Sequence, residues 1–561
     1  MLILYNYYIH FYRGQGMSYL KKFPLIGSAL LLLQGCTVLP RLEIGPSNAK
    51  QSVVKTTISP GLTHFQVKIR SAINQYTLTS QLMSDEDAKL LVQKINFITK
   101  PQLGGTPLST EDIIIEDFNE FNGLTLNLGK KVFIGRFDST EDASVFNAQL
   151  SKQGIDLKII NASSRAYQAG NFEVSILKVD PLIYEGKVSS ILANNRVQGL
   201  ATVSEIANQV KAVASVNGGF FAYREDQGVP GDLAGISVID GTLVSEAIIN
   251  RPALLINNSP SLSFKILNKV STSMSVGIDG NFQAIDGINR KLKYMFNCGY
   301  DDDGLTVPAS HDVVCKDEDD AVIYDQNFGD IADVLNQENF TFWIDKSQHI
   351  YLRPNASQIN YVPNGHYLVA VSGNKRALFE PLVLQGSTAE FSQVVYNEGN
   401  QVILEKGMYI INGGPSLLVN KETQESNWEM QGWSPFVQDV GSQSLDKRDE
   451  VPDSKQVQQS RKDFYDSWVM QRHPRTAVGL SLDGALYVVV IYGREPLRSM
   501  GASVPEMANI MRSLGAVNAL NLDGGGSSVM VVNGLITGNP SDNTGERKVA
   551  DTLVFVSAGK E

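Results

Sequence analysis

The chain has 561 residues, which is too long for one compact core and predicts two or more domains. Its composition, 43% hydrophobic and 19% charged, is that of an ordinary globular protein. With 59 acidic and 48 basic side chains the formal net charge is -11. Nucleic-acid backbones favour surfaces rich in Lys and Arg, so the charge balance argues against nucleic acid as a partner.

The N-terminus has the features of an export signal. Lys21 and Lys22 precede an apolar run, residues 25–33, that is too short to span a bilayer. The run leads into Leu33-Gln34-Gly35-Cys36, which is similar to a bacterial lipobox, where the signal is cut before an acylated Cys. This interpretation takes Met17 as the true start and residues 1–36 as the signal; a short membrane anchor or an uncleaved signal is the alternative. We expect a lipid-anchored protein on the periplasmic side of the envelope, in the outer membrane of a Gram-negative bacterium.

Cysteine usage agrees with export. The chain has three cysteines, Cys36, Cys298 and Cys315. If Cys36 carries lipid, the other two can form a disulfide in an oxidising compartment. The polar, acidic segment between them is typical of a stapled surface loop; two unrelated free thiols are the alternative.

Two stretches between residues 75 and 162 resemble each other. In each, a short apolar strand is followed by a helix that begins at a serine, Ser84 or Ser139, with an acid three residues on. The second unit continues into a further strand, residues 155–160, so the pattern predicts a strand-helix-strand-strand-helix-strand (βαββαβ) module.

This order, with the phrase Gly-Arg-Phe-Asp-Ser-Thr-Glu-Asp-Ala at residues 135–143, resembles the SPOR domain. That family binds peptidoglycan glycan strands that lack stem peptides, so the resemblance implies peptidoglycan as a partner. We expect the SPOR-like domain at residues 71–163, after a linker at 37–70. A generic ferredoxin-like module is the alternative.

From about residue 165 the pattern changes to short strands joined by tight turns. Asp240-Gly241, Asp279-Gly280, Asp483-Gly484 and Asn533-Gly534 each lie between apolar runs, the strongest local signal of a hairpin. Two helices are expected to begin at Thr202 and Ser503, each with a Glu three residues later. The mixture predicts an α+β domain.

Two glycine-rich phrases each follow a strand. The first is Asn217-Gly-Gly-Phe-Phe221 and the second is Asp523-Gly-Gly-Gly-Ser-Ser528. Consecutive glycines allow positive φ and bring several N–H groups to one point, a geometry that binds anions such as phosphate. Two tight turns without a ligand are the alternative.

The segment Asn521–Met530 is similar to the signature of the phosphodiester glycosidase family, and other family-like phrases follow the family's order over residues 165–558. These phrases begin at Val216, Gly235, Gly287, Asn412, His473 and Gly545. The resemblance implies a mixed-sheet α+β hydrolase that cleaves an N-acetylglucosamine-like sugar from a sugar-1-phosphodiester or a related envelope polysaccharide. Two insertions depart from the family pattern, one around Cys298 and Cys315 and one at residues 421–470, and these put the substrate in doubt.

Such chemistry needs a carboxylate pair, donors for the phosphate and a pocket for the sugar. Asp523 and Glu546 are the predicted catalytic acid/base pair. The predicted substrate-binding residues supply guanidinium groups, amides, hydroxyls and backbone donors. They are Asn217, Gly218, Gly219, Arg251, Arg290, Arg475, Thr476, Asn521, Gly524, Gly525, Gly526, Ser527 and Arg547. For Arg251 and Arg290 a structural ion pair is an equal alternative.

Other catalytic classes are poorly supported by the sequence. It has no Gly-x-Ser-x-Gly elbow at a strand-to-helix turn and no spacing typical of zinc, and its acidic runs are typical of solvated loops. We expect no metal and no cofactor. Two other functions stay open: a non-catalytic lipoprotein that binds peptidoglycan or another glycan, and a peptidoglycan glycosidase.

Overall fold

The computed structural model describes residues 39–71, 76–99, 113–118, 120–121, 124–125, 129–161, 170–248, 250–296, 311, 314–336, 339–352, 360–424, 428, 431–433 and 464–558. The predicted signal with Met17 and Cys36 lies outside these residues. So do Cys298 and the side chain of Cys315, and the disulfide stays a prediction. Within the described part, no helix has the length and apolar character needed to cross a membrane.

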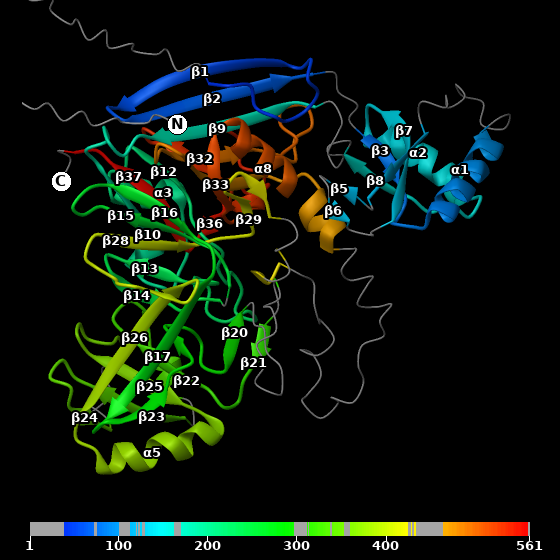
Figure 1. Cartoon of the computed structure of the whole chain (residues 1–561). Helices are drawn as coiled ribbons and strands as arrows, with labels where there is room; N and C mark the ends of the chain where they lie inside the picture. The colour runs from blue at the N-terminus through cyan, green and yellow to red at the C-terminus, as the bar shows by residue number, and fades with distance from the viewer. Residues whose placement is uncertain are drawn as a thin grey trace, which may run out of the picture. The chain divides into compact units, whose positions relative to one another are not determined.

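An eight-stranded antiparallel sheet is the largest element of the fold (Figure 1). Its order is β1-β2-β9-β32-β31-β33-β29-β30. The strands are β1 (Lys50–Ser59), β2 (Leu62–Arg70), β9 (Phe172–Val179), β32 (Leu486–Ile491), β31 (Arg475–Ser481), β33 (Ala516–Asn521), β29 (Ser416–Val419) and β30 (Glu422–Thr423). Strands from both ends of the chain therefore share one sheet.

The predicted linker at residues 37–70 is wrong over most of its length, because β1 and β2 form a hairpin at the edge of this sheet. Apolar residues alternate along β2, and its buried face carries Phe65, Val67 and Ile69. β2 also pairs directly with β9, with Ile69 opposite Phe172. The segment between these two strands is thus an insertion into the larger domain. At its base the Ser71 hydroxyl donates to the Gly170 carbonyl at 2.9 Å.

The inserted segment folds as its own four-stranded antiparallel sheet, in the order β4-β7-β3-β8. Its elements are β3 (Tyr76–Thr79), α1 (Asp85–Thr99), β4 (Ile113–Asp117), β5 (Glu120–Phe121), β6 (Leu124–Thr125), β7 (Lys130–Phe137), α2 (Thr140–Ser151) and β8 (Lys158–Asn161). As expected, Ser84 and Ser139 accept the backbone N–H of Asp87 and Asp142 at 3.1 and 3.0 Å. The relation to SPOR domains and the binding of peptidoglycan stay predictions.

A second sheet of the larger domain has the order β10-β37-β12-β34-β35. Its strands are β10 (Lys187–Leu192), β37 (Asp551–Val556), β12 (Ala214–Asn217), β34 (Met530–Val532) and β35 (Leu535–Ile536). Two helices, α3 (Val203–Gln209) and α8 (Val504–Ser513), begin where the sequence predicts, each with a complete capping box.

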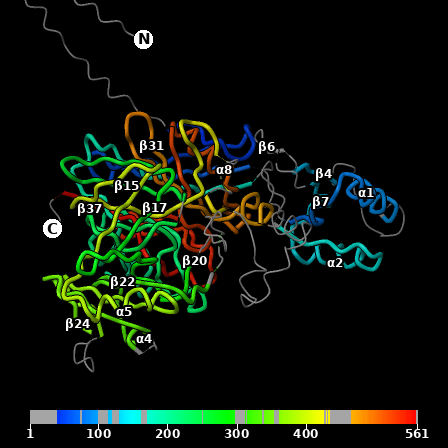
Figure 2. The backbone as a smooth tube through the Cα atoms, turned by 60° about the horizontal axis from the view of Figure 1, so that its bottom comes forward, coloured from blue at the N-terminus to red at the C-terminus, as the bar shows by residue number. Residues whose placement is uncertain are grey.

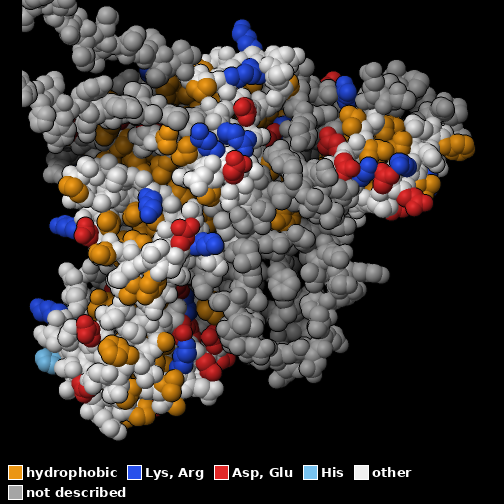
Figure 3. Space-filling view, viewed as in Figure 1, with side chains coloured by type: hydrophobic (Ala, Val, Ile, Leu, Met, Phe, Trp, Pro, Cys, Tyr) orange, Lys and Arg blue, Asp and Glu red, His pale blue; other side chains and the backbone are white. Residues whose placement is uncertain are grey.

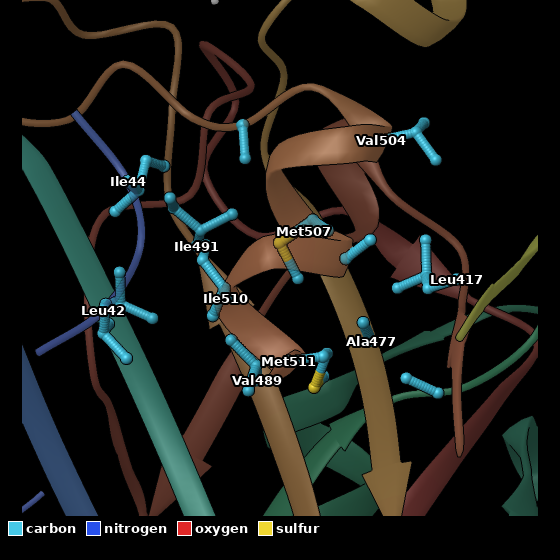
Figure 4. Close-up of a cluster of buried hydrophobic side chains, with 14 of the residues drawn as sticks. Leu42, Ile44, Leu417, Ala477, Val489, Ile491, Val504, Met507, Ile510 and Met511 are labelled. Atoms are coloured by element: carbon cyan, nitrogen blue, oxygen red, sulfur yellow. The ribbon is translucent and has the colours of Figure 1, made fainter. Parts of the chain in front are cut away.

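Helix α8 packs on one face of the eight-stranded sheet (Figure 4). Met507, Ile510 and Met511 are fully buried against side chains that include Val489 and Ile491 of β32. Leu42 and Ile44, from the segment before β1, belong to the same buried cluster (Figure 4). Burial of a large aliphatic side chain contributes roughly 1.5–3 kcal/mol, so this N-terminal segment is part of the folded domain.

Residues 237–412 build most of the remaining sheets (Figures 1 and 2). One contains β13 (Ser237–Ile239), β14 (Thr242–Ser245), β15 (Ala253–Asn257), β16 (Ser263–Leu267) and β28 (Met408–Asn412). The next contains β17 (Val270–Ile278), β18 (Asn281–Ala284), β26 (Ala389–Asn397) and β27 (Asn400–Val402). The third contains β19 (Gly287–Ile288), β22 (Ala321–Tyr324), β23 (Phe340–Ile344), β24 (Ile350–Tyr351) and β25 (Tyr367–Val371).

Short elements complete the described chain: the pairs β11 (Ala201–Thr202) with β36 (Lys548–Val549) and β20 (Tyr294–Phe296) with β21 (Val314–Lys316), and the helices α4 (Ala332–Asn336) and α5 (Arg376–Gln385). The predicted turns at Asp240, Asp279 and Asn533 have the positive φ of a tight hairpin. Many antiparallel sheets with few helices confirm the α+β class. Acidic and basic side chains are interspersed on the face in Figure 3.

Candidate active site

The two glycine-rich turns predicted from the sequence meet in the structure. Asn217 ends β12, and its side-chain amide donates to the Asp523 carbonyl at 2.8 Å. Its side-chain oxygen accepts from the Thr476 hydroxyl at 2.7 Å. In return, the Asp523 N–H donates to the Gly218 carbonyl at 3.3 Å. Because Asn217 and Thr476 are fully buried and bonded to protein, they hold the two turns together.

The first turn needs glycine because side chains occupy the space where a Cβ would lie. A Cβ on Gly218 would lie 2.3 Å from Oδ1 of Asp551, and one on Gly219 would lie 2.5 Å from Nδ2 of Asn412. The Gly219 N–H donates to Oδ1 of Asp551 at 3.0 Å, and the Phe220 N–H donates to Oδ1 of Asn412 at 2.8 Å. The turn therefore rests on a carboxyl and an amide from other strands.

The second turn uses part of its backbone internally. The Gly524 N–H donates to Oδ1 of Asp523 and the Gly525 N–H donates to the Pro474 carbonyl, both at 2.8 Å. These two predicted phosphate donors are thus occupied in this conformation. A 3₁₀ turn follows at Gly525–Ser527, with Gly525 at φ +60.

Buried polar atoms gather in the segments that form these turns. The hydroxyls of Ser527, Ser528 and Thr552 and the side-chain oxygen of Asn521 are buried and have no hydrogen-bond partner among the described residues. Thr552 lies opposite Asn217 in the pairing of β37 with β12. A buried polar atom left unpaired costs roughly 1–3 kcal/mol. Such a concentration is therefore evidence for a polar ligand at this place.

Arg475 brings positive charge to the site. It is 3% exposed and begins β31, and its guanidinium donates to the carbonyl oxygens of Ala502 and Trp468. Burial, with a smaller contribution from Arg494, lowers the pKa of Arg475 to about 9. No described carboxylate lies within ion-pair distance of this guanidinium. A buried guanidinium surrounded by carbonyl groups favours the binding of an anion.

Arg494 is a site residue that the sequence analysis missed. It follows β32 with φ 65, which a non-glycine residue adopts at an energetic cost. Its Nη2 atom lies 3.3 Å from the position of a Cβ on Gly525. Burial and the charge of Arg547 lower the pKa of Arg494, whereas Asp542, whose carboxylate lies 3.8 Å from Nη1 of Arg494, raises it. The sequence signal that could have identified Arg494 is its place after a buried strand and a glycine, Gly493.

Arg547 lies over the next glycine, but it already has a partner. Its guanidinium donates to both carboxylate oxygens of Asp542, at 2.7 and 3.1 Å. A Cβ on Gly526 would lie 2.3 Å from both Nη2 of Arg547 and Oδ1 of Asp542. Arg547 therefore contributes less free positive charge to the turn than Arg475 does.

Other predicted site residues have structural contacts that explain their presence. Arg290 makes two 2.8 Å bonds to Asp320 and one 2.9 Å bond to Glu246, which is the structural alternative for this residue. The Glu546 carboxylate accepts the Ser204 N–H at 2.8 Å, in the first turn of α3. Neither contact is directed at the glycine-rich turns.

The two insertions are joined by an aromatic cluster next to the first glycine turn. The ring of Phe220 lies 4.9 Å from that of Trp433, which stacks on Trp468 at 5.2 Å. Trp468 also stacks on Phe464 at 5.3 Å, and His311 of the other insertion lies 4.8 Å from Trp433. The insertions thus border the site, and they are positioned to influence which substrate enters.

This aromatic cluster also holds two of the predicted arginines. Arg251 lies over the Trp433 ring at 4.2 Å, and Arg475 lies over the Trp468 ring at 5.2 Å. Arg251 also donates to the carbonyl oxygens of Gln431 and Gly432 at 3.3 and 3.2 Å. Stacking on indole rings stabilises a guanidinium without neutralising its charge.

The carboxyl of Asp551 was also missed by the sequence analysis. Burial, with a smaller contribution from the charge of Asp523, raises its pKa to about 6, while bonds from Gly219 and Ser190 act in the opposite direction. It lies in the last strand, among apolar residues, where only the fold shows its proximity to the first glycine turn. Within the described part of the chain, no cluster of three or more His, Cys, Asp or Glu side chains could hold a metal ion.

Comparison with known proteins agrees with this geometry. Residues 345–556, which include Arg475, Asp523 and Asp551, match the model of the phosphodiester glycosidase family. The chain carries a phosphodiester glycosidase-like domain. A segment of 69 residues is 44% identical to N-acetylglucosamine-1-phosphodiester alpha-N-acetylglucosaminidase of Mus musculus. It covers 12% of this chain and 13% of the mouse protein.

Two bacterial proteins are also similar to this chain. The prophage-derived uncharacterized protein YomE of Bacillus subtilis is 45% identical over 84 residues, which cover 15% of this chain and 13% of that protein. The matched segments thus span only about an eighth of these curated relatives. The solved structure of a Burkholderia pseudomallei protein, predicted to be exported, has a TM-score of 0.71 and 26% identity. The match covers 92% of this chain and 98% of that one.

Proposed function

We propose that this chain is a hydrolase that cleaves a sugar from a sugar-1-phosphodiester, with an N-acetylglucosamine-like sugar as the expected glycone. The family match and the mouse relative supply the reaction class. The observation that carries the proposal is the pair of unpaired, buried hydroxyls of Ser527 and Ser528. They end the glycine turn that begins at Asp523, and Arg475 and Arg494 lie next to the glycines of that turn.

The reaction breaks the bond between the anomeric carbon and the phosphodiester oxygen, and water supplies the new hydroxyl. A phosphate leaves with negative charge on its oxygens, so the guanidinium groups of Arg475 and Arg494 stabilise it as the bond breaks. Asp523 is the proposed carboxylate at the anomeric centre, either as base for the water or as nucleophile. Glu546 stays in the proposal as the second carboxylate, although its contact with α3 supports it less than Asp523.

For the setting of this reaction we propose the cell envelope. The lipobox-like sequence ending at Cys36 and the predicted export of the Burkholderia pseudomallei relative support a lipid-anchored, periplasmic enzyme. The inserted domain would then hold the enzyme on peptidoglycan. An envelope polysaccharide with phosphodiester links is the matching polymeric substrate.

The test uses purified protein that begins at Leu39. We would incubate it with UDP-N-acetylglucosamine and with the methyl diester of N-acetylglucosamine-1-phosphate, and quantify free sugar and the phosphate product, which is UDP or methyl phosphate. The wild type should release both products in equal amounts, and Asp523→Asn should release neither. Asp483→Asn is the matched control, because Asp483 also precedes a glycine but lies in an exposed hairpin.

Each other outcome argues for a different function. Release of sugar without phosphomonoester from peptidoglycan fragments would indicate a peptidoglycan glycosidase. Binding of glycan strands without turnover of any diester would indicate a non-catalytic lipoprotein. Activity retained by Asp523→Asn would remove Asp523 from the reaction.

A further inference from the structure

Asp551 lies directly behind the first glycine turn. It is the first residue of β37, and its side chain is 1% exposed. Oδ1 accepts the Gly219 N–H at 3.0 Å, and Oδ2 accepts the Ser190 hydroxyl at 3.3 Å. Its backbone carbonyl accepts the Gly218 N–H at 3.0 Å. Both glycines of the turn are therefore bonded to one residue.

The turn connects Asp551 to Asp523. The Gly218 carbonyl accepts the N–H of Asp523, so a chain of hydrogen bonds runs from the Asp551 backbone through Gly218 to the proposed catalytic residue. The two carboxyl groups are also close enough for their charges to repel. Among the described residues, no Lys or Arg forms an ion pair with Asp551.

The surroundings of Asp551 contain few charges. From β10 it faces the Ser190 hydroxyl, and from β12 it faces the backbone of the Gly218–Gly219 turn. The charged group that acts on it from the second glycine turn is Asp523. Its protonation is thus set by burial, two hydrogen bonds and one like charge.

We propose that Asp551 is a positioning residue of this site: its buried carboxyl holds the Gly218–Gly219 turn in the conformation that places Asp523 for catalysis. Burial raises the pKa of Asp551 in the closed turn above its value in water, so the closed turn binds the proton more tightly than an opened, solvated turn does. Ionisation of Asp551 therefore loosens the turn. This inference rests on the proposed function for its catalytic consequence. The control of the turn itself does not depend on that function.

The first experiment is a pH profile of kcat/KM on the N-acetylglucosamine-1-phosphate methyl diester. For the wild type, kcat/KM should fall as the pH is raised through about 6, which is where the pKa of Asp551 lies. In Asp551→Asn, whose amide oxygen can still accept the Gly219 N–H but cannot ionise, this limb should be lost. In Asp551→Ala, which removes that acceptor, kcat should fall about tenfold or more at pH 5, with KM changed much less. Asp325→Asn is the matched control, because Asp325 is another buried aspartate whose pKa is raised by burial, in a different sheet. It should keep the limb.

The second experiment needs no turnover. Hydrogen exchange of the peptide that covers residues 214–222, corrected for intrinsic rates, should show more protection at pH 5 than at pH 7 in the wild type. Asp551→Asn should show equal protection at both values. A limb near pH 6 that persists in Asp551→Asn, or wild-type protection that is independent of pH, overturns the inference. If no diester is cleaved but the exchange behaves as stated, the proposed reaction fails and the control of the turn stands.

Discussion

The buried carboxyl of Asp551 should make the stability of the protein depend on pH in a way that one substitution removes. Its pKa is raised from 3.8 to about 6 in the folded protein. Between these values the folded state keeps the proton while the unfolded state releases it. Stability from this group is therefore fully present below about pH 3.8 and is lost as the pH rises through 6. Two pKa units correspond to about 3 kcal/mol.

Urea unfolding of wild type and Asp551→Asn from pH 4.5 to 7 measures this effect. The free energy of unfolding of the wild type, minus that of the variant, should decrease across this range by about 2 kcal/mol, because about 1.5 pH units separate pH 4.5 from the folded pKa. Asp483→Asn is a useful comparison, because a hydroxyl bond from Ser481 lowers the pKa of Asp483, so no such decrease is expected. A difference that stays constant for Asp551→Asn would show that this carboxyl is already ionised at pH 4.5, and the reasoning would fail.

Three further predictions concern the site and the insertion. Asn217→Ala should lower the free energy of unfolding by about 2–6 kcal/mol, because it leaves the Thr476 hydroxyl and the Asp523 carbonyl without a partner; a loss below 1 kcal/mol in urea unfolding would contradict this. Arg494→Ala should lower kcat/KM for the diester about tenfold, ~1.4 kcal/mol, with the exposed Arg376→Ala as control; equal kinetics of both variants would remove Arg494 from the phosphate site. Replacing residues 72–169 by a short Gly-Ser turn should keep cooperative unfolding and turnover of the soluble diester, because Ile69 and Phe172 are already paired. Its free energy of unfolding should be lower, because Phe118 and Phe133 leave the buried cluster of the larger domain. An unfolded product by circular dichroism would contradict this.

The sequence correctly predicted those helices and turns that are stabilised by contacts between residues close together in the chain. Both capping-box helices begin at the expected residues, because a hydroxyl and a glutamate three residues apart satisfy the same N–H groups in any context. The hairpin turns at Asp240 and Asn533 have the same kind of local cause. The linker prediction failed although β1 and β2 pair locally as a hairpin, because the sheet edge on which that hairpin lies is supplied by β9, more than a hundred residues away in the chain.

The sequence predicted the part of the candidate site that lies in or beside the two glycine-rich phrases. Asn217, Thr476 and Asp523 lie within one hydrogen-bond network, as their motifs indicate, and Arg475 directly precedes Thr476 in β31. Arg290 could not be separated from a structural ion pair by sequence, because its partner Asp320 is thirty residues away in an acidic segment that was interpreted as solvated. Asp551 could not be predicted as a site residue, because an aspartate at the start of an apolar strand gives no indication of the turn that it contacts in the fold.

The two glycine turns require glycine for different reasons, so a compensating substitution can help in the first turn but not in the second. Gly218 and Gly219 are small because Asp551 and Asn412 fill the positions of their side chains, whereas Gly525 has a positive φ that favours glycine whatever surrounds it. Removing the Asp551 side chain would therefore free space beside Gly218, but no such change would relieve Gly525. Gly218→Ala combined with Asp551→Ala should thus lose less stability than the sum of the two single changes, because the clash and the buried charge are removed together.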